Sequence, residues 1–243
     1  TRLECVTGVQ TCALPICRYK RFLADVVTSD GTPLTLHCPN TGSMKNCAQP
    51  NSRVWFWDSA NEKRKYACTW ELVEVQQQFL ACINTQRANG LVVEAINNAT
   101  ITPLQGYNKL ETEIKYGQEN SRIDIFLSQH QHQPDCYVEV KNVTLMVGQG
   151  QGLFPDAVTQ RGSKHLRELV HMVSQGYRAV LVYCVAHTGI TQVAPAWDLD
   201  PAYAKTLVWA MEQGVEVMAY GAHISLTEMS LVRVVPLNLG SGD

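Results

Sequence analysis

Glu139 and Lys141 lie two positions apart in an otherwise largely apolar segment, residues 136–145. The β-branched and aromatic residues of this segment predict a strand. In a strand, a spacing of two puts both charges on one face, opposite Val138 and Val140. One interpretation is a solvated sheet face with a cross-strand ion pair. The other is half of a metal-dependent site that cleaves phosphodiester bonds, and the surrounding residues decide between them.

Asp124 favours the second interpretation because of its place in the chain. It lies in predicted strand 122–127, on the face opposite the two isoleucines of that strand. If this strand pairs with segment 136–145, the carboxylates of Asp124 and Glu139 approach within one strand spacing, about 5 Å. They then repel unless a divalent cation lies between them, and Mg²⁺ binds one or two carboxylates together with substrate phosphate. Lys141 would stabilise charge that develops on the phosphate or position the attacking water.

Two further carboxylates are candidate ligands for the same magnesium site. Glu94 lies on predicted helix 87–97, and Glu113 lies on predicted strand 109–116. Glu113 also begins a second Glu-x-Lys triplet, but no strand aspartate precedes that triplet and no apolar strand, loop and helix follow it. We therefore place the catalytic residues at Asp124, Glu139 and Lys141. For Glu94 and Glu113 the alternative is an ordinary solvated helix or strand face.

Basic side chains that could meet DNA phosphates gather in three short stretches. One opens the chain after residue 17, one precedes the predicted strand that runs to residue 75, and one begins an amphipathic helix, whose N-terminus suits a phosphate. A solvated basic face is the alternative for the helix. The candidate DNA-binding residues are Arg18, Lys20, Arg21, Arg64, Lys65, Arg161, Lys164 and His165.

The second half of the chain has the pattern of an α/β domain that would position these residues. Helical spacing of apolar residues predicts helix 87–97 and a helix containing Leu166 and Leu169 that Gly176 ends. The continuous apolar run 178–185 predicts a strand buried on both faces. The remaining predicted elements are strands 109–116, 122–127, 136–145 and 215–220 and helix 201–213.

The first half predicts a small all-β barrel of the OB type. Asp30-Gly31 between two alternating runs predicts a hairpin of strands 22–27 and 33–37. Further strands are predicted at 54–57, 65–75 and 79–84, and such barrels often bind nucleic acids. Core packing accounts for most of the aromatic residues that could stack on bases, which are Trp55, Trp57, Tyr66 and Trp70.

Composition limits the classes of function. The 243 residues are 45% apolar and carry a net charge of −2, which excludes a disordered or histone-like chain and confines any nucleic-acid surface to a local basic patch. No apolar run approaches the roughly 20 residues of a transmembrane helix, so we expect no membrane association. The nine cysteines form no C-x-x-C pair, and we expect reduced thiols in the cytoplasm.

The first 16 residues have a sequence that indicates a different origin from the rest of the chain. Segment 6–16, V-T-G-V-Q-T-C-A-L-P-I, resembles the translation of a common sequencing-library adapter. We therefore interpret 1–16 as a foreign segment, with a native N-terminal strand as the alternative. The predicted domains are then an OB-like domain at 17–85 and an α/β domain at 86–243.

Several motifs, in order from about residue 18 to residue 236, resemble the sugar fermentation stimulation protein A family. They are 18–25 (RYKRFLAD), 38–42 (CPNTG), 63–66 (KRKY), 69–71 (TWE), 121–124 (SRID), 139–141 (EVK) and 154–169. The resemblance implies a bacterial DNA-binding protein with an OB-like domain, a C-terminal domain that resembles PD-(D/E)XK nucleases, and a link to genes for maltose and other sugars. Asp124, Glu139 and Lys141 match the nuclease motif, whereas Asn142 and Ser43 depart from the family pattern.

Three functions from different classes remain open. The first is a protein that binds double-stranded DNA and assists transcription. The second is a Mg²⁺-dependent DNA nuclease, which explains why two carboxylates would stand where a polyanion approaches. The third is a scaffold for a partner protein. DNA binding is the function that we expect, and the nuclease is the alternative.

Overall fold

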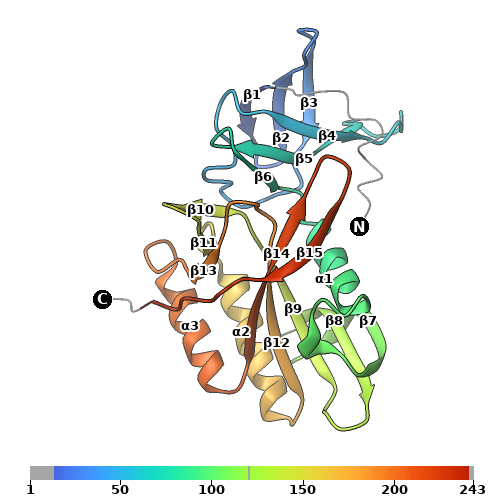
Figure 1. The fold of residues 1–243 in the computed structure, drawn as a ribbon, viewed down its shortest axis with the longest axis vertical. Helices are drawn as coiled ribbons and strands as arrows, with labels where there is room; N and C mark the ends of the chain where they lie inside the picture. The colour runs from blue at the N-terminus through green and yellow to red at the C-terminus, as the bar shows by residue number, and fades with distance from the viewer. Residues whose placement is uncertain (1–13, 120, 241–243) are drawn as a thin grey trace.

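The computed structural model describes residues 14–119 and 121–240, which form two domains along the long axis of the molecule (Figure 1). The N-terminal domain is a six-stranded sheet in the order β1-β2-β3-β5-β4, with β6 paired to β5. Its strands are β1 (Leu14–Tyr19), β2 (Leu23–Val27), β3 (Pro33–His37), β4 (Val54–Asp58), β5 (Cys68–Val75) and β6 (Phe79–Cys82).

The predicted hairpin around Asp30-Gly31 is present as β2 and β3, which pair from Leu23↔His37 to Val27↔Pro33. Gly31 has a φ of +83°, a conformation that glycine adopts without strain. The sheet encloses one apolar core in which Trp70 is fully buried, with its indole N–H donating to the Leu72 carbonyl at 2.9 Å. Trp70 is therefore a core residue and cannot stack on a base.

Strand β1 is absent from the main prediction, which begins the strands at residue 22, although a native N-terminal strand is the alternative for residues 1–16. It pairs antiparallel with β2, beginning at Leu14↔Val27. The predicted foreign segment thus contributes its last residues to the sheet, while residues 1–13 lie outside the described residues. The origin of that segment stays a prediction.

The C-terminal domain is built on a second six-stranded sheet in the order β15-β14-β12-β9-β8-β7. Strands β9, β12 and β14 are parallel, and the outer pairs are antiparallel. The elements along the chain are α1 (Arg87–Asn97), η1 (Thr102–Leu104), β7 (Tyr107–Tyr116), β8 (Ser121–His130), β9 (Cys136–Val143), β10 (Leu145–Val147), β11 (Gln151–Phe154), α2 (Gln160–Ser174), β12 (Arg178–Val185), β13 (Gln192–Pro195), α3 (Pro201–Glu212), β14 (Glu216–Ile224) and β15 (Met229–Val234).

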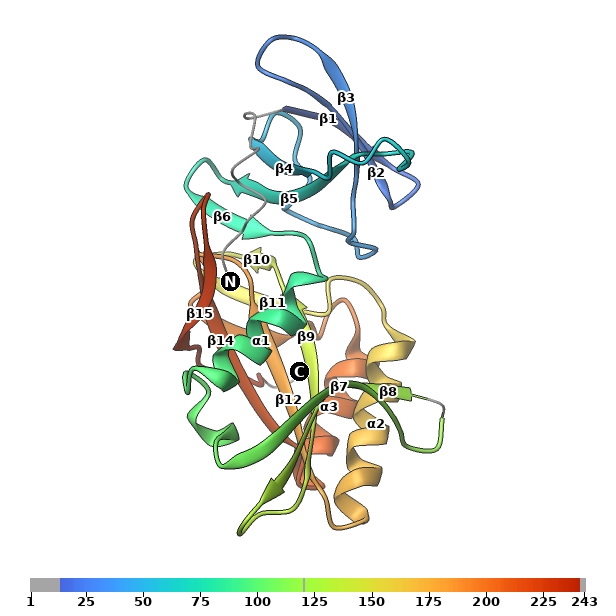
Figure 2. The same cartoon turned by 90° about the vertical axis from the view of Figure 1, so that its right-hand side faces the viewer.

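Helices cover both faces of this sheet, α1 on one side and α2 with α3 on the other (Figure 2). Val138 and Val140 of β9 lie in the core beneath α1, whereas Tyr137 packs against the core beneath α2 and α3. The alternation predicted for this strand is therefore present, and it turns Glu139 and Lys141 toward α2. An all-β domain followed by an α/β domain, as the sequence predicts, is confirmed.

The two helices that flank β12 begin at a shared carboxylate. Asp200 is the N-cap of α3 and accepts from the Tyr203 amide at 2.9 Å, while its other oxygen accepts from the amide of Thr159, the N-cap of α2, at 2.7 Å. Each N-cap satisfies backbone donors that a helix leaves free. Asp200 thereby fixes the start of α2, the helix that carries Arg161 and His165.

Strands β10, β11 and β13 form a small separate sheet between the domains, and the sequence does not predict it. The N-terminal domain contacts this region through several residues, among them one in β6 and one in the loop before β4. Ala81 of β6 bridges His187, and the Asn46 side-chain amide donates to the Met146 carbonyl at 2.9 Å. Within the described residues, no helix is long and apolar enough to cross a membrane.

Candidate functional site

Glu139 is the most enclosed charged residue of the predicted site, with 1% of its surface exposed. Its Oε1 atom lies 2.5 Å from Lys141 Nζ and accepts a hydrogen bond from His165 Nδ1, on α2. Its Oε2 atom is buried and has no hydrogen-bond partner among the described residues. Since a buried carboxylate oxygen normally has a partner, this atom has an unused ligand position.

Asp124 approaches Glu139 through the backbone of β9. The pairing of β8 with β9 ends at Ile125↔Val138, so it does not include Asp124, the residue next to Ile125. Asp124 Oδ2 accepts from the amide of Val140 at 2.7 Å, and Oδ1 accepts from the Asn89 side chain, on α1, at 2.9 Å. The Asp124 carboxylate therefore lies at the residue that directly follows Glu139.

One detail of the predicted strand is wrong. Ile123 and Ile125 were expected on one face opposite Asp124, but Ile123 lies in the core beneath α2 and Ile125 in the core beneath α1. Residues two apart share a face in a regular strand. Strand β8 therefore changes face at Asp124, which is the irregularity that separates β8 from β9 and opens the site.

The two carboxylates differ in their electrostatic environments. Burial, and then the charge of Glu139, raise the pKa of Asp124 to about 6. Burial alone would also raise the pKa of Glu139, but Lys141 and His165 outweigh it and hold this pKa below its ordinary value. Glu139 is thus charged at neutral pH because a cation and a hydrogen-bond donor pay for its burial.

The site can hold a divalent cation that takes only a few of its ligands from the protein. Glu139 Oε2 and the Asp124 carboxylate are the candidate oxygens, and no group of three or more His, Cys, Asp and Glu side chains placed to hold a metal ion occurs in residues 14–119 and 121–240. Mg²⁺ suits such a site because it commonly binds one or two carboxylates and keeps several waters.

The two additional carboxylates take different positions. Glu113 stands opposite Asp124 in the β7–β8 register, between Thr112↔Ile125 and Ile114↔Ile123, but it is exposed and its φ is +58°. On α1, the residue whose side chain bonds Asp124 is Asn89, and Glu94 lies outside the lining of the adjoining cavity. The roles of Glu113 and Glu94 as ligands stay predictions.

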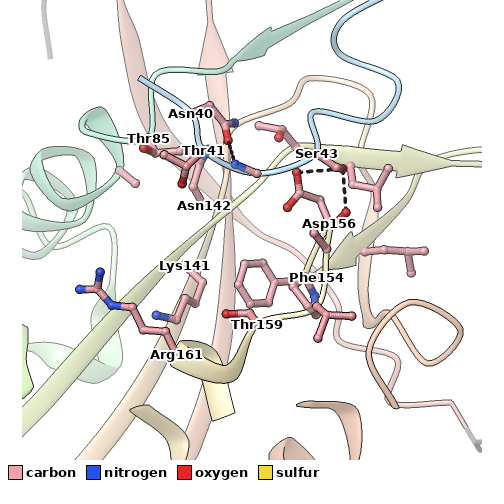
Figure 3. Close-up of a pocket in the computed structure, with 18 of the residues that line it drawn as sticks. Asn40, Thr41, Ser43, Thr85, Lys141, Asn142, Phe154, Asp156, Thr159 and Arg161 are labelled. Carbon is pink, nitrogen blue, oxygen red and sulfur yellow. Dashed lines mark hydrogen bonds between the residues drawn. The ribbon is translucent and has the colours of Figure 1, made fainter. Parts of the chain in front are cut away.

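A cavity of about 670 Å³ adjoins the site, between the two domains (Figure 3). Lys141 and Asn142 of β9 lie on one side of it, and residues 153–159 leading into α2 form a wall. Residues 40–43 of the N-terminal domain cover it. Four basic side chains line it, which are Arg18, Arg21, Lys141 and Arg161. Arg18 and Arg21, which are far from Lys141 in the sequence, thus line the same cavity as Lys141.

Arg18 also has a structural task. Its guanidinium donates to the carbonyls of Asn40 at 2.7 Å and Gly42 at 2.9 Å, and further to those of Arg21 and Ser43. All four acceptors are neutral carbonyls. Arg18 therefore holds the loop over the cavity in place, and its charge still adds to the potential inside.

The other predicted DNA-binding residues are not all at the cavity. His165 is buried, with Nδ1 on Glu139 and Nε2 accepting from Arg161 Nε at 3.3 Å, so it positions the carboxylate from within. Lys164 donates to the Glu119 carbonyl. The exposed residues Arg64 and Lys65 lie between β4 and β5, against Trp57 and Tyr66, and Lys20 is exposed at the turn between β1 and β2.

Three site residues were missed from the sequence, and all are uncharged or lie in loops. Asn89 orients Asp124, Asn40 Oδ1 accepts from the Gly42 amide at 2.8 Å, and Asp156 accepts from the Met44 amide at 3.0 Å. Asn40 and Asp156 belong to motifs that the sequence marks, C-P-N-T-G and F-P-D. The role of Asp156 depends on a contact between the domains, which the spacing along the chain does not reveal.

Comparison with known proteins assigns both domains. The model described as the SfsA N-terminal OB domain matches residues 16–83, and the model described as the sugar fermentation stimulation protein RE domain matches residues 86–228. The chain is 57% identical over 226 residues to the sugar fermentation stimulation protein homolog of Shewanella piezotolerans, covering 93% of this chain and 96% of that protein. It is 58% identical over 208 residues to the homolog of Shewanella frigidimarina, covering 86% and 88%.

A solved structure has the same fold. The SfsA protein of Pyrococcus furiosus, determined in complex with Ca²⁺, superposes with a TM-score of 0.85 at 24% identity. The match covers 98% of this chain and all of that one. The two-domain arrangement is therefore shared across a wide sequence distance.

Proposed function

The chain belongs to the sugar fermentation stimulation protein family, and from that premise we propose that it binds double-stranded DNA and takes part in regulating sugar utilisation, including that of maltose. The observation that supports DNA binding is the group of basic side chains around the cavity between the domains, of which Arg21 and Arg161 are exposed and can meet duplex phosphates outside it. Four basic side chains line it, and the one carboxylate in its lining, Asp156, is bonded to Ser43 and Met44. This local concentration of charge suits a polyanion although the whole chain carries a net charge of −2.

Salt dependence tests the DNA-binding proposal. Affinity for a duplex should fall steeply as salt rises, because each phosphate contact releases condensed counterions. Removing Arg21 or Arg161, as Arg21→Ala or Arg161→Ala, should flatten the slope of log affinity against log salt by about one contact each. The pair Arg64→Ala and Lys65→Ala should flatten it as well, since both side chains are exposed.

Fluorescence anisotropy of a labelled duplex across a salt series measures these slopes. Lys205→Ala, which removes an exposed lysine on α3, serves as the matched control and should leave the slope unchanged. Affinity that ignores salt would sink the proposal.

A second activity, hydrolysis of DNA with a divalent cation, is favoured by the orphan oxygen of Glu139. That Oε2 atom is buried without a partner, while Oε1 of the same carboxylate contacts Lys141, as expected of a carboxylate whose second oxygen binds a metal ion. Glu139 and Asp124 would hold Mg²⁺, which would activate a water and neutralise charge on the phosphate. The related archaeal protein was determined with Ca²⁺, an ion that binds the same kind of oxygen ligand.

The side chains of this chain then have separate tasks in the reaction. Lys141, on the cavity side of Glu139, places a cation where the phosphate gains charge. His165 fixes Glu139 Oε1 and Asn89 fixes Asp124 Oδ1, so both carboxylates are oriented before substrate arrives. Arg161, 3.3 Å from His165, can hold a neighbouring phosphate.

Cleavage assays decide the nuclease proposal. Supercoiled and linear DNA incubated with Mg²⁺ or Mn²⁺ should be cut by the native chain, with a loss of about 100-fold or more in Lys141→Ala and in Asp124→Asn. Lys205→Ala should cut normally. Cleavage that Lys141→Ala and Asp124→Asn leave unchanged would come from a contaminant. Calorimetric titration of Mg²⁺ into the native chain and Glu139→Gln measures metal binding without a substrate.

A further inference from the structure

A loop of the N-terminal domain bridges the cavity over Lys141. At one end, the Pro39 carbonyl accepts from Thr85 Oγ1, just before α1, at 3.1 Å. At the other end, Ser43 Oγ donates to the Asp156 carbonyl at 2.7 Å, and the amide of Met44 also bonds to the Asp156 side chain. Residues 40–42, between these anchors, line the cavity (Figure 3). The loop is thus attached to both walls of the space that it covers.

The bridge fits its anchors without slack. A Cβ atom on Gly42 would lie 2.5 Å from the Asp156 carboxylate, so the backbone there is in direct contact with the opposite wall. From behind, the Arg18 guanidinium holds the carbonyls of Asn40 and Gly42. Opening the cavity from above therefore requires breaking bonds at Asp156 and at Thr85, and not merely a rotation of side chains.

The space beneath the bridge is small for a duplex. Its volume of about 670 Å³ lies within the roughly 300–1,000 Å³ of pockets that enclose a small-molecule ligand, which is room for about one or two nucleotides. A B-form duplex is far larger, since its major groove alone is about 12 Å wide. A base-paired segment cannot occupy the cavity while the bridge is attached.

The lining suits a single strand. Arg21, Lys141 and Arg161 can bind successive phosphates, and Thr41, Asn142 and Phe154 offer hydrogen-bonding groups and an aromatic ring between them. Positive charge that follows the backbone, combined with side chains that accept unstacked bases, is the usual design of single-strand binding.

We infer that DNA reaches Lys141 as a single strand threaded beneath residues 40–42, so that the preferred substrates are DNAs with a free single-stranded end, such as an overhang or a flap. This inference rests on the proposed DNA function and names its substrate class. Duplex segments stay outside the bridge, against the exposed basic residues. The preference for a single strand over a duplex arises from the bonds of Ser43 and Met44 to Asp156, because these bonds keep the bridge closed.

Binding tests the inference without requiring hydrolysis. The native chain, in EDTA, is titrated by anisotropy against three DNAs: a blunt duplex, the same duplex with a single-stranded overhang, and the same duplex with a gap. The overhang should bind about tenfold more tightly than the blunt duplex or better, the effect of one stacked base. The gap has no free single-stranded end and should bind like the blunt duplex. Equal affinities for all three overturn the inference alone, whereas no binding to any DNA overturns the proposed function as well.

Variants of the anchor provide the second arm. Asp156→Ala removes the carboxylate that accepts from the Met44 amide at 3.0 Å and from Ser43 Oγ at 3.3 Å, and leaves the bond from Ser43 Oγ to the backbone carbonyl of residue 156. It should reduce the preference for the overhang to about twofold or less, without weakening overhang binding, because only duplex access is gained. Asp156→Asn keeps an acceptor oxygen and should retain most of the preference. Asp198→Ala, which removes an exposed carboxylate nearby in sequence to α3, is the control. A preference that Asp156→Ala leaves intact overturns the role given to the bridge.

Discussion

Lys141 and His165 both contact Glu139 Oε1, and Arg161 in turn contacts His165. Arg161 Nε donates to His165 Nε2, so Nε2 is an acceptor and the imidazole proton is on Nδ1. This tautomer, assigned from the hydrogen bonds, lets Nδ1 donate to Glu139 Oε1. Lys141 Nζ lies 2.5 Å from the same Glu139 oxygen and 3.2 Å from His165 Nδ1, so it brings a full positive charge to this carboxylate. Removal of Lys141 therefore leaves a buried carboxylate without its counter-charge.

Asp124 makes the stability of the metal-free protein depend on pH. Its pKa of about 6 exceeds the ordinary value of 3.8, so between these values the folded state holds a proton that the unfolded state releases. Stability from this residue is therefore present at low pH and is lost as pH rises to about 6, by at most about 3 kcal/mol. Asp124→Asn should remove this loss, because asparagine does not ionise.

Urea unfolding of the native chain and Asp124→Asn in EDTA, at pH 5 and pH 7.5, measures this effect. The variant should gain stability relative to the native chain at the higher pH. Added Mg²⁺ should reverse the order, because it stabilises the charged carboxylate. A native chain whose stability differs from the variant equally at both pH values would contradict the prediction.

The sequence predicts part of the site because strand periodicity is local. Glu139 and Lys141 share a face as their spacing requires, and that face is turned toward a helix. The position of Asp124 is different in kind. Its carboxylate reaches β9 because β8 changes face there, and its second oxygen is held by Asn89 from another element. Neither the break in the strand nor the amide partner leaves a signal in the spacing of residues.

At the scale of elements, α2 holds the β7–β8 hairpin through one buried carboxylate. Glu168 accepts from the amides of Gln118 and Glu119, at 2.9 and 2.8 Å. Gly117 has a φ of +70°, and a Cβ there would meet the Glu168 carboxylate. The hairpin that delivers Asp124 is thus fixed to the helix that delivers His165, which keeps both sides of the site in register.

Glu168→Ala should loosen this link. It leaves two backbone amides without acceptors and should cost about 3 kcal/mol of unfolding free energy. Hydrogen exchange should accelerate most in residues 116–124, and DNA cleavage should fall with it. Glu212→Ala, an exposed position at the end of α3, is the control and should change stability by less than about 0.5 kcal/mol. Exchange that rises uniformly over the molecule would argue against a local link.

Long elements with a clear period are predicted well, and short ones are not. Helix α1 and strand β12 have the predicted bounds, because each carries its own apolar pattern over several residues. Strands β10, β11 and β13 have three or four residues each and exist through pairing with one another. The sequence of the Gly-rich segment 148–152 predicts a loop, because it does not reveal the strand around residue 192 with which this segment pairs.

At the scale of the whole molecule, the domains are joined by an ion pair of a buried glutamate and a partly exposed arginine, as well as by the bridge. Glu71 of β5 accepts from Asn84 at 2.8 Å and from Arg87, the first residue of α1, at 3.1 Å. Removing one member of a buried pair is costly because the other charge stays behind. The two domains should therefore unfold together.

Glu71→Ala should cost about 3 kcal/mol or more and should separate the domains' transitions. Three tryptophans report on the N-terminal domain and two on the C-terminal domain, and far-ultraviolet circular dichroism follows the helices of the latter. Native fluorescence and dichroism transitions should coincide in urea, whereas those of Glu71→Ala should not. Glu62→Ala, at an exposed position, should behave as the native chain. Separate transitions in the native chain would show that the domains are independent.

The pairing of β6 with residues 186–188 has a consequence for synthesis of the chain. Leu80 donates to Thr188, which follows it by 108 residues, and Cys82 donates to Ala186. A ribosome that adds about 5–20 residues per second needs about 5 to 20 s to make that partner. During this interval the newly made N-terminal barrel presents the free edge of β6, a template for unwanted strand pairing. A chaperone at the ribosome exit would find its substrate there, on the strand that later joins the two domains.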